Sequence, residues 1–134
     1  MNLNSRKALV SRLRRGRRTR RQFAESHLAK TLAHQVRAMR DTEQWSQQEL
    51  AKKLGTTQNV VYRLESSDYG RQTLTTLKKV AAEFDVALVV RFVPFSELVD
   101  WVSGTPRVSR GLDCNALAAP SFQAEAAASD VFTK

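Results

Sequence analysis

The residue types and spacings that could carry a chemical function lie between Ser46 and Glu65. Ala51 is small enough to let two helices approach closely, and Gly55, four positions later, tolerates the backbone of a tight turn. Val61, ten positions after Ala51, can then bury its branched side chain between the two helices. The apolar residues that complete this small core are Leu50, Leu54 and Leu64. The register predicts a helix-turn-helix, a unit whose second helix enters the major groove, where side chains hydrogen-bond to base edges.

Capping signals delimit the two helices of this unit. Ser46 stands three residues before Glu49, the spacing of a capping box in which each side chain accepts a hydrogen bond from the other residue's backbone amide. Gly55 is expected to end the first helix and Thr57 to cap the second, which we place at Thr57 to Ser66. An ordinary helical hairpin without a DNA role is the alternative, but the turn residues and the basic charge favour the helix-turn-helix.

The segment QQELAKKLGTTQNVVYRLE resembles the helix-turn-helix of the phage Cro/repressor class, also called the xenobiotic-response-element class. The resemblance extends over about Leu32 to Phe84 and therefore includes the flanking helices. It implies a compact bundle of four or five helices that binds double-stranded operator DNA as a dimer.

The resemblance also implies which side chains read bases. Family members begin the recognition helix with paired glutamines, and this chain has Gln58 and Asn59 there. Arg63 replaces a later base-reading glutamine. Gln and Asn both pair bidentately with adenine, whereas Arg prefers O6 and N7 of guanine. We therefore expect base readout by Gln58, Asn59 and Arg63, and an operator that differs from those of the best-known members.

Contacts with the DNA backbone are expected around the same helix. Gln47 matches the glutamine that holds a phosphate in the family, and Arg71 and Gln72 match a loop that grips the backbone. Thr57 is assigned to the backbone as well. Tyr62, on the outer side of the recognition helix, could contact a phosphate or a thymine methyl. A partly exposed packing role is equally consistent with a tyrosine at this position.

The positive charge of the chain is concentrated at its N-terminus. The net charge is +9, from 22 basic and 13 acidic residues, and residues 1–24 contain nine basic groups and no acidic one. These nine are Arg6, Lys7, Arg12, Arg14, Arg15, Arg17, Arg18, Arg20 and Arg21. We expect residues 1–21 to be a basic arm, with a short helix or strand around Ala8 to Leu13, that suits a polyanion because neutralised phosphates release counterions. A solubility tail, or a non-specific nucleic-acid binder dominated by the arm, are the alternatives.

The remaining apolar patterns predict further helices and one strand. Apolar residues at three- and four-residue steps predict helices over about Arg20 to Arg40 and Thr73 to Phe84. Val86 to Val93 is rich in β-branched residues and predicts a strand, and Ser96 to Val102 could add one or two helical turns. We therefore expect a mainly α protein, a compact bundle of four to five helices containing the helix-turn-helix and followed by one β-strand.

The expected strand needs a partner, because a lone strand leaves its backbone groups unpaired. The simplest partner is the same strand of a second copy, antiparallel across a two-fold axis, which would also place two recognition helices one DNA turn apart. The residues assigned to this dimerisation are Val86, Leu88, Val90 and Phe92. Pairing within one chain to residues near Lys7 to Val10 is the alternative.

Two functions follow from these patterns. A homodimeric transcription regulator, acting as a repressor on a palindromic operator, is the first. The strand directly after the last helix, in SSDYGRQTLTTLKKVAAEFDVALVVRF, also resembles the arrangement in HipB-like and HigA-like antitoxins, and in HipB-like members this strand builds a sheet between subunits. The alternative is therefore an antitoxin of a type II toxin-antitoxin module, which neutralises a protein toxin and autoregulates its operon.

Other sites are not expected. His27 and His34 are too few ligands for a metal, Cys114 is the sole cysteine, and the five glycines are too scattered to form a phosphate loop. We expect neither an enzyme, nor a cofactor, nor a metal. The longest apolar stretch is far too short to span a membrane, so a cytoplasmic protein is expected. The helix-turn-helix domain would cover residues 22–102, and residues 103–134 are predicted to be a disordered tail.

Overall fold

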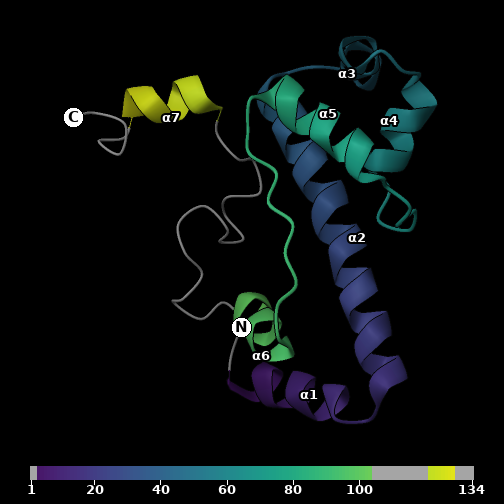
Figure 1. The fold of residues 1–134 in the computed structure, drawn as a ribbon, viewed down its shortest axis with the longest axis vertical. Coiled ribbons are helices and arrows are strands. Elements are labelled where there is room, and N and C mark those ends of the chain that lie inside the picture. Colours follow the sequence, from purple (N-terminus) through teal and green to yellow (C-terminus); the bar gives the residue numbers. More distant parts are fainter. Residues whose placement is uncertain (1–2, 104–120, 129–134) are drawn as a thin grey trace.

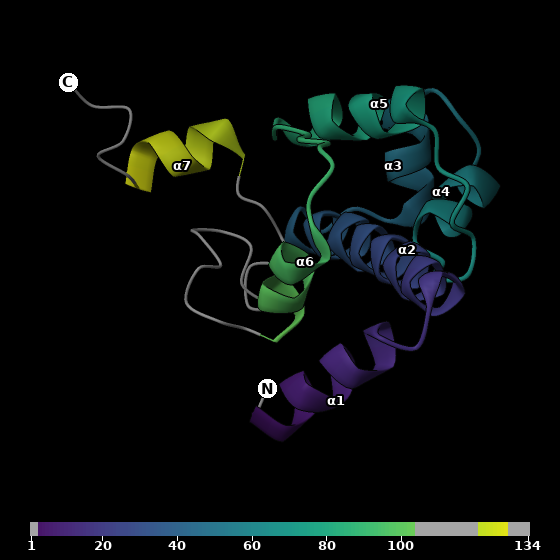
Figure 2. The ribbon, with the colours of Figure 1, turned by 60° about the horizontal axis from the view of Figure 1, so that its bottom comes forward.

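The longest element is helix α2, Arg17–Thr42, which has helices packed near both of its ends (Figure 1). This computed structural model describes residues 3–103 and 121–128. The other helices in these residues are α1 (Leu3–Leu13), α3 (Gln47–Leu54), α4 (Gln58–Leu64), α5 (Leu74–Phe84), α6 (Phe95–Val102) and α7 (Phe122–Ala128). Helices α3, α4 and α5 gather at the C-terminal end of α2, and α1 and α6 lie near its N-terminal end (Figures 1 and 2). No helix among the described residues is long and apolar enough to cross a membrane.

The main core lies where α2, α3, α4 and α5 meet. Its buried side chains are Val36, Met39, Leu50, Ala51, Val61, Leu64, Val80 and Phe84. Trp45, in the connection between α2 and α3, stacks on Phe84 with 5.3 Å between ring centroids. The mainly helical class is therefore confirmed, and the core sits directly beneath α3 and α4, where it can hold their orientation.

A second, smaller core joins α1 to α6. Leu9 and Leu13, four residues apart on one face of α1, are buried against Val99 of α6, with Phe23 of α2 beside them. Arg6 on the same helix forms an ion pair of 2.9 Å with Asp100. The basic segment is thus helical over most of its length and packed, where the sequence indicated an arm with a short element.

The boundary expected after residue 21 falls inside α2, which begins at Arg17 and continues without interruption to Thr42. The helix expected from Arg20 to Arg40 is therefore longer at both ends. The helical turns expected at Ser96 to Val102 are confirmed as α6, whose N-cap is Pro94.

The strand expected at Val86 to Val93 is not confirmed, since the described residues contain no strand. Residues 86–94 instead form an irregular connection that runs beside α2 from α5 to α6 (Figure 1). Val86 and Leu88 line a small cavity of about 60 Å³ against α2 and α5, whereas Val90 and Phe92 are exposed. β-Branched residues favour an extended backbone, but a strand also requires a paired neighbour. Pairing to Lys7 to Val10 is wrong, because those residues lie within α1.

The C-terminal region is described only in part. The disordered tail predicted for residues 103–134 lies largely outside the described residues, since 104–120 and 129–134 are not among them. Within it, Phe122–Ala128 forms α7, and the Phe122 amide donates a 3.0 Å hydrogen bond to the carbonyl of Asp85. This contact brings the start of α7 to the end of α5.

Candidate nucleic-acid interface

Helix α3 begins and ends as its local sequence predicts. The Ser46 hydroxyl accepts a 3.1 Å hydrogen bond from the Glu49 amide, and the Ser46 amide donates a 2.8 Å bond to the Glu49 carboxylate, so the capping box is confirmed. Gly55 ends the helix with φ of 68° and ψ of 35°, the left-handed conformation that glycine adopts most cheaply. These two signals fix the length of α3 and make Gln47 its first residue.

The turn after Gly55 brings α4 across α3. Leu50 and Val61 have no exposed surface, Ala51 and Leu64 are 3% exposed, and Leu54 is half-buried. Thr57 occupies the N-cap position of α4, but its side chain makes no capping hydrogen bond. The inner face of α4 is therefore held by apolar packing, which leaves its outer face free to contact a ligand.

The outer face of α4 is polar and open to solvent. The predicted site residues exposed on this helix are Gln58, Asn59, Tyr62 and Arg63. The Gln58 amide lies 3.5 Å from the side-chain oxygen of Gln47, which is half-buried at the start of α3. The Arg63 guanidinium lies over the ring of Tyr69, 5.8 Å from its centroid. The structure thus brings the base-reading candidates together with Gln47 on one surface.

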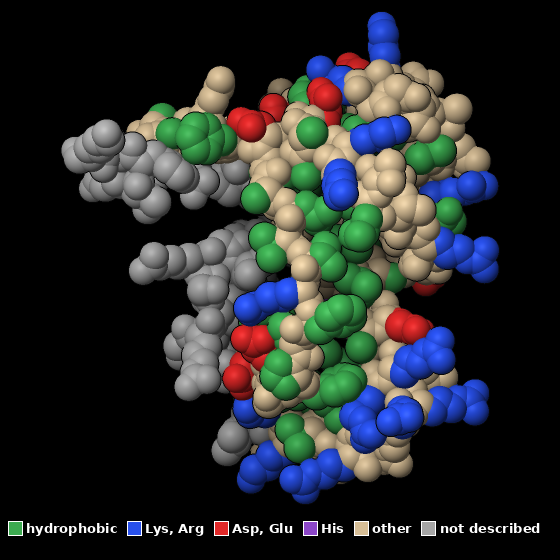
Figure 3. Space-filling view, viewed as in Figure 1, with side chains coloured by type: hydrophobic (Ala, Val, Ile, Leu, Met, Phe, Trp, Pro, Cys, Tyr) green, Lys and Arg blue, Asp and Glu red, His purple; other side chains and the backbone are tan. Residues whose placement is uncertain are grey.

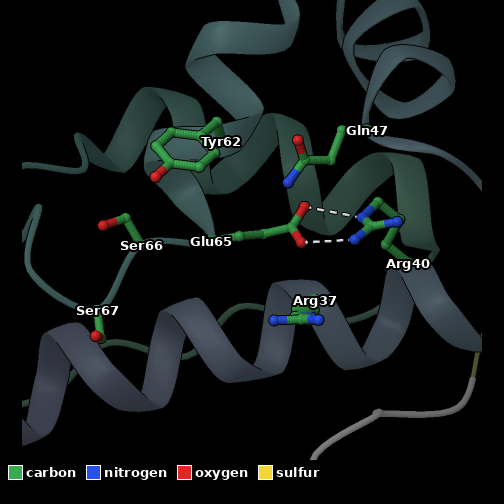
Figure 4. Close-up of a pocket in the computed structure, with 7 residues that line it drawn as sticks. All are labelled: Arg37, Arg40, Gln47, Tyr62, Glu65, Ser66 and Ser67. Carbon is green, nitrogen blue, oxygen red and sulfur yellow. Dashed lines mark hydrogen bonds and ion pairs between the residues drawn. The ribbon is translucent and has the colours of Figure 1, made fainter.

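A hollow of about 310 Å³ opens beside this surface, between α2, α3 and α4 (Figure 4). Its lining residues are Arg37, Arg40, Gln47, Tyr62, Glu65, Ser66 and Ser67. Figure 4 shows the Gln47 amide directed toward the pair formed by Arg40 and Glu65, with Arg37 along α2. The hollow therefore presents amide, hydroxyl and guanidinium donors next to the outer face of α4.

Five residues of this hollow were not among the predicted site residues: Arg37, Arg40, Glu65, Ser66 and Ser67. Arg40 and Glu65 form a pair within it. Two hydrogen bonds of 2.8 Å join the guanidinium to the carboxylate, and Arg40 also donates to the carbonyl of Trp45 at 2.7 Å. Hydrogen bonding of the Arg40 guanidinium to the Glu65 carboxylate is the main cause that raises the pKa of Arg40, and burial opposes it. Since Glu65 neutralises Arg40, the more exposed Arg37 is the cation of the hollow that faces solvent, with Asp41 4.0 Å away.

The loop after α4 holds the two remaining backbone candidates. Arg71 is exposed, whereas Gln72 is half-buried, and its side-chain nitrogen is buried without a hydrogen-bond partner among the described residues. Gly70, with φ of 58°, runs close to α2, because a Cβ added there would lie 3.7 Å from that of Ala29. The structure therefore places Arg71 at the surface and turns part of Gln72 inward.

This geometry defines a helix-turn-helix unit, and comparison with known families agrees. Residues 36–90 match a family model described as helix-turn-helix, and these residues contain both α3 and α4. No curated protein and no solved structure matches the chain. The likeness to HipB-like and HigA-like antitoxins gains no support from these comparisons, and the antitoxin hypothesis stays a prediction.

Proposed function

We propose that the protein is a sequence-specific transcription regulator that reads the major groove of DNA with the outer face of α4. The observation that carries this proposal is the two-sided character of α4. Its inner side chains Val61 and Leu64 are buried in the main core, while Gln58, Asn59 and Arg63 project into solvent. Side chains of these types match adenine and guanine edges, and a rigid inner face gives them a fixed register.

The hollow beside α4 supports phosphate binding in the same complex. Gln47 lies at the start of α3, where free backbone amides add to its side-chain donor. Arg37 supplies a positive charge at the rim, and Arg71 supplies another beyond the end of α4. Such contacts fix the orientation of a protein on the duplex without reading sequence. Arg40 and Glu65 would position this surface without themselves carrying net charge.

A homodimer is part of the proposal, because one short helix contacts too few base pairs for a specific operator. The connection between α5 and α6 exposes Val89, Val90 and Phe92, which are 78%, 65% and 106% exposed, and Leu28 on α2 is 60% exposed. Figure 3 shows hydrophobic side chains along this side of the molecule, between the connection and α2. We assign the face to a second copy of the chain, since an extended apolar connection can pair with its own copy across a two-fold axis.

This assignment changes the set of dimerisation residues. Val90 and Phe92 are exposed and can reach a partner, whereas Val86 and Leu88 already pack within their own chain. The dimer would act as a repressor by covering a promoter that contains a palindromic operator.

The experiment that tests this function is selection of bound sequences from a pool of randomised duplexes. A palindromic consensus is expected, and Arg63→Ala should lose the preference at one position of each half-site, by about 1–3 kcal/mol. Gln47→Ala should instead weaken binding to all sequences similarly, because a phosphate contact carries no sequence information. A pool that yields no consensus would contradict the assignment of α4 as a reading helix.

A further inference from the structure

The corner between α1 and α2 carries a dense group of positive charges that the proposed function does not use. We call Arg14, Arg15, Arg17 and Arg18 the basic corner; all four are exposed. Among the described residues, none of the four has a carboxylate within ion-pairing distance, whereas their neighbours Arg6 and Arg21 pair with Asp100 and Glu25. The basic corner therefore carries positive charge that no described carboxylate neutralises.

Folding alone does not account for this arrangement. Helix α2 starts at Arg17, its N-cap Gly16 offers no side-chain hydrogen bond, and its first turn contains no acidic residue. Positive side chains at a helix N-terminus oppose the helix dipole, so Arg17 and Arg18 weaken the helix that they begin. An anionic partner would offset this repulsion.

The position of the corner is fixed by packing. Leu9 and Leu13 are buried against Val99, and Arg20 donates a 3.0 Å hydrogen bond to the carbonyl of Leu13 across the corner. The charges therefore sit at a defined place on the molecule, unlike those of a flexible arm.

That place lies on the same side of the molecule as α4. Figures 1 and 2 both show the α1–α2 turn below α4 on one side, and Figure 3 shows Lys and Arg side chains along this margin at both levels. Arg17 and Arg37 belong to one continuous helix, and their separation of 20 residues corresponds to about 30 Å at 1.5 Å per residue. This length is close to one turn of B-DNA, about 34–36 Å, after which the backbone presents the same face again.

We infer that the basic corner is a second DNA-backbone site, which grips phosphates about one duplex turn away from the base pairs read by α4. The inference rests on the proposed function, because it needs α4 to position the duplex. The basic corner would add contacts with the DNA backbone that have no sequence preference. The protein would then cover a longer stretch of duplex than a helix-turn-helix alone would cover.

The test uses the full chain and two duplexes. The first duplex contains only the selected consensus, and the second extends this consensus on both sides by about 12 base pairs. Wild-type protein should bind the extended duplex at least about tenfold more tightly at low salt. The double variant Arg17→Gln with Arg18→Gln should lose most of this difference, and its slope of log affinity against log salt should fall by about 0.9 per lost phosphate contact. The matched control is Lys78→Gln with Lys79→Gln, which removes two adjacent exposed charges from α5 and should preserve both quantities.

The outcomes separate this inference from the proposed function. Equal affinity of the wild type for both duplexes, or equal losses in the two double variants, would overturn the second site while the consensus survives. Equally tight binding to single-stranded RNA of the same length would also overturn it, because the corner would then be a general polyanion site. Absence of any consensus would instead contradict the role of α4, and this inference would fall with it. Thermal unfolding of the arginine double variant should be unchanged or higher, which excludes loss of folding as the cause.

Discussion

Arg40 and Glu65 join the last turn of α2 to the residue that follows α4 through two parallel hydrogen bonds of 2.8 Å. The side chains are 13% and 3% exposed, so this is a nearly buried, bidentate pair. A charge left alone at such a site is costly, because neither water nor a partner compensates it. The pair therefore links the reading helix to the central helix of the molecule.

Removing one member of this pair should destabilise the protein strongly. Arg40→Ala leaves the Glu65 carboxylate buried and unpaired, and we expect the free energy of unfolding to fall by about 3–5 kcal/mol in urea titrations. The double variant Arg40→Met with Glu65→Leu should recover most of this loss. Arg37→Ala serves as the control, since its ion pair with Asp41 is exposed and should contribute less than about 1 kcal/mol. A single-variant loss as small as that of the control would contradict the role given to the pair.

The two N-caps of the helix-turn-helix should respond differently to the same truncation. Ser46→Ala removes the hydroxyl oxygen that accepts a capping hydrogen bond from the Glu49 amide, and the free energy of unfolding should drop by about 1 kcal/mol. Thr57→Ala should cost clearly less, because the Thr57 side chain makes no capping bond. Both free energies are measurable by chemical denaturation. Equal losses would contradict the expected difference, because they would mean that the Thr57 side chain also makes a capping hydrogen bond.

Phe92 allows a test of the proposed dimer that does not disturb the fold of one chain. Its side chain is 106% exposed, so Phe92→Asp should leave the monomer's thermal unfolding unchanged while shifting sedimentation toward the monomer. Leu74→Asp alters another exposed apolar residue, on α5 and outside the proposed interface, and should leave the dimer intact. A dimer that resists Phe92→Asp would place the interface elsewhere.

His27 should make stability depend on pH. Burial disfavours its charged form and lowers the pKa of His27 from the ordinary 6.5. The unfolded chain then binds the proton more tightly than the folded chain, so this contribution to stability is complete above pH 6.5 and declines as the pH falls through the unfolded value. Thermal unfolding between about pH 7 and pH 5 should show a shallower decline in His27→Gln than in the wild type. If the unfolding temperatures of the wild type and of His27→Gln decline equally with pH, His27 is not the source of the pH dependence.

The sequence predicted those parts of the fold that depend on neighbouring residues. Ser46 and Glu49 are three positions apart, and Gly55 is close to both, so the caps and the turn follow from local hydrogen bonds and backbone preference. The mainly helical class and the helix-turn-helix follow from the same local patterns.

The missed features depend on residues that are distant in the sequence. Arg40 and Glu65 are 25 positions apart, and Leu9 meets Val99 only after the chain has returned along α2. Neither contact leaves a periodic signal in its own segment. The predicted strand is not confirmed for a related reason: Val86 to Val93 has the composition of a strand, but the described residues contain no neighbouring strand with which it could pair.

The two cores differ in size, and this difference predicts the order in which the parts of the molecule unfold. Of the residues that the structure describes, eight are buried in the core beneath α3 and α4, whereas three are buried in the core that holds α1 to α6. Amides of α1 and α6 should therefore exchange with deuterium well before those of α3 and α4, as a separate cooperative unit. The chain has two tryptophans, one for each part: Trp45 packs on the larger core and Trp101 lies on α6. Fluorescence of single-tryptophan variants would then give two unfolding midpoints, and the basic corner would loosen while the reading helix is still in place.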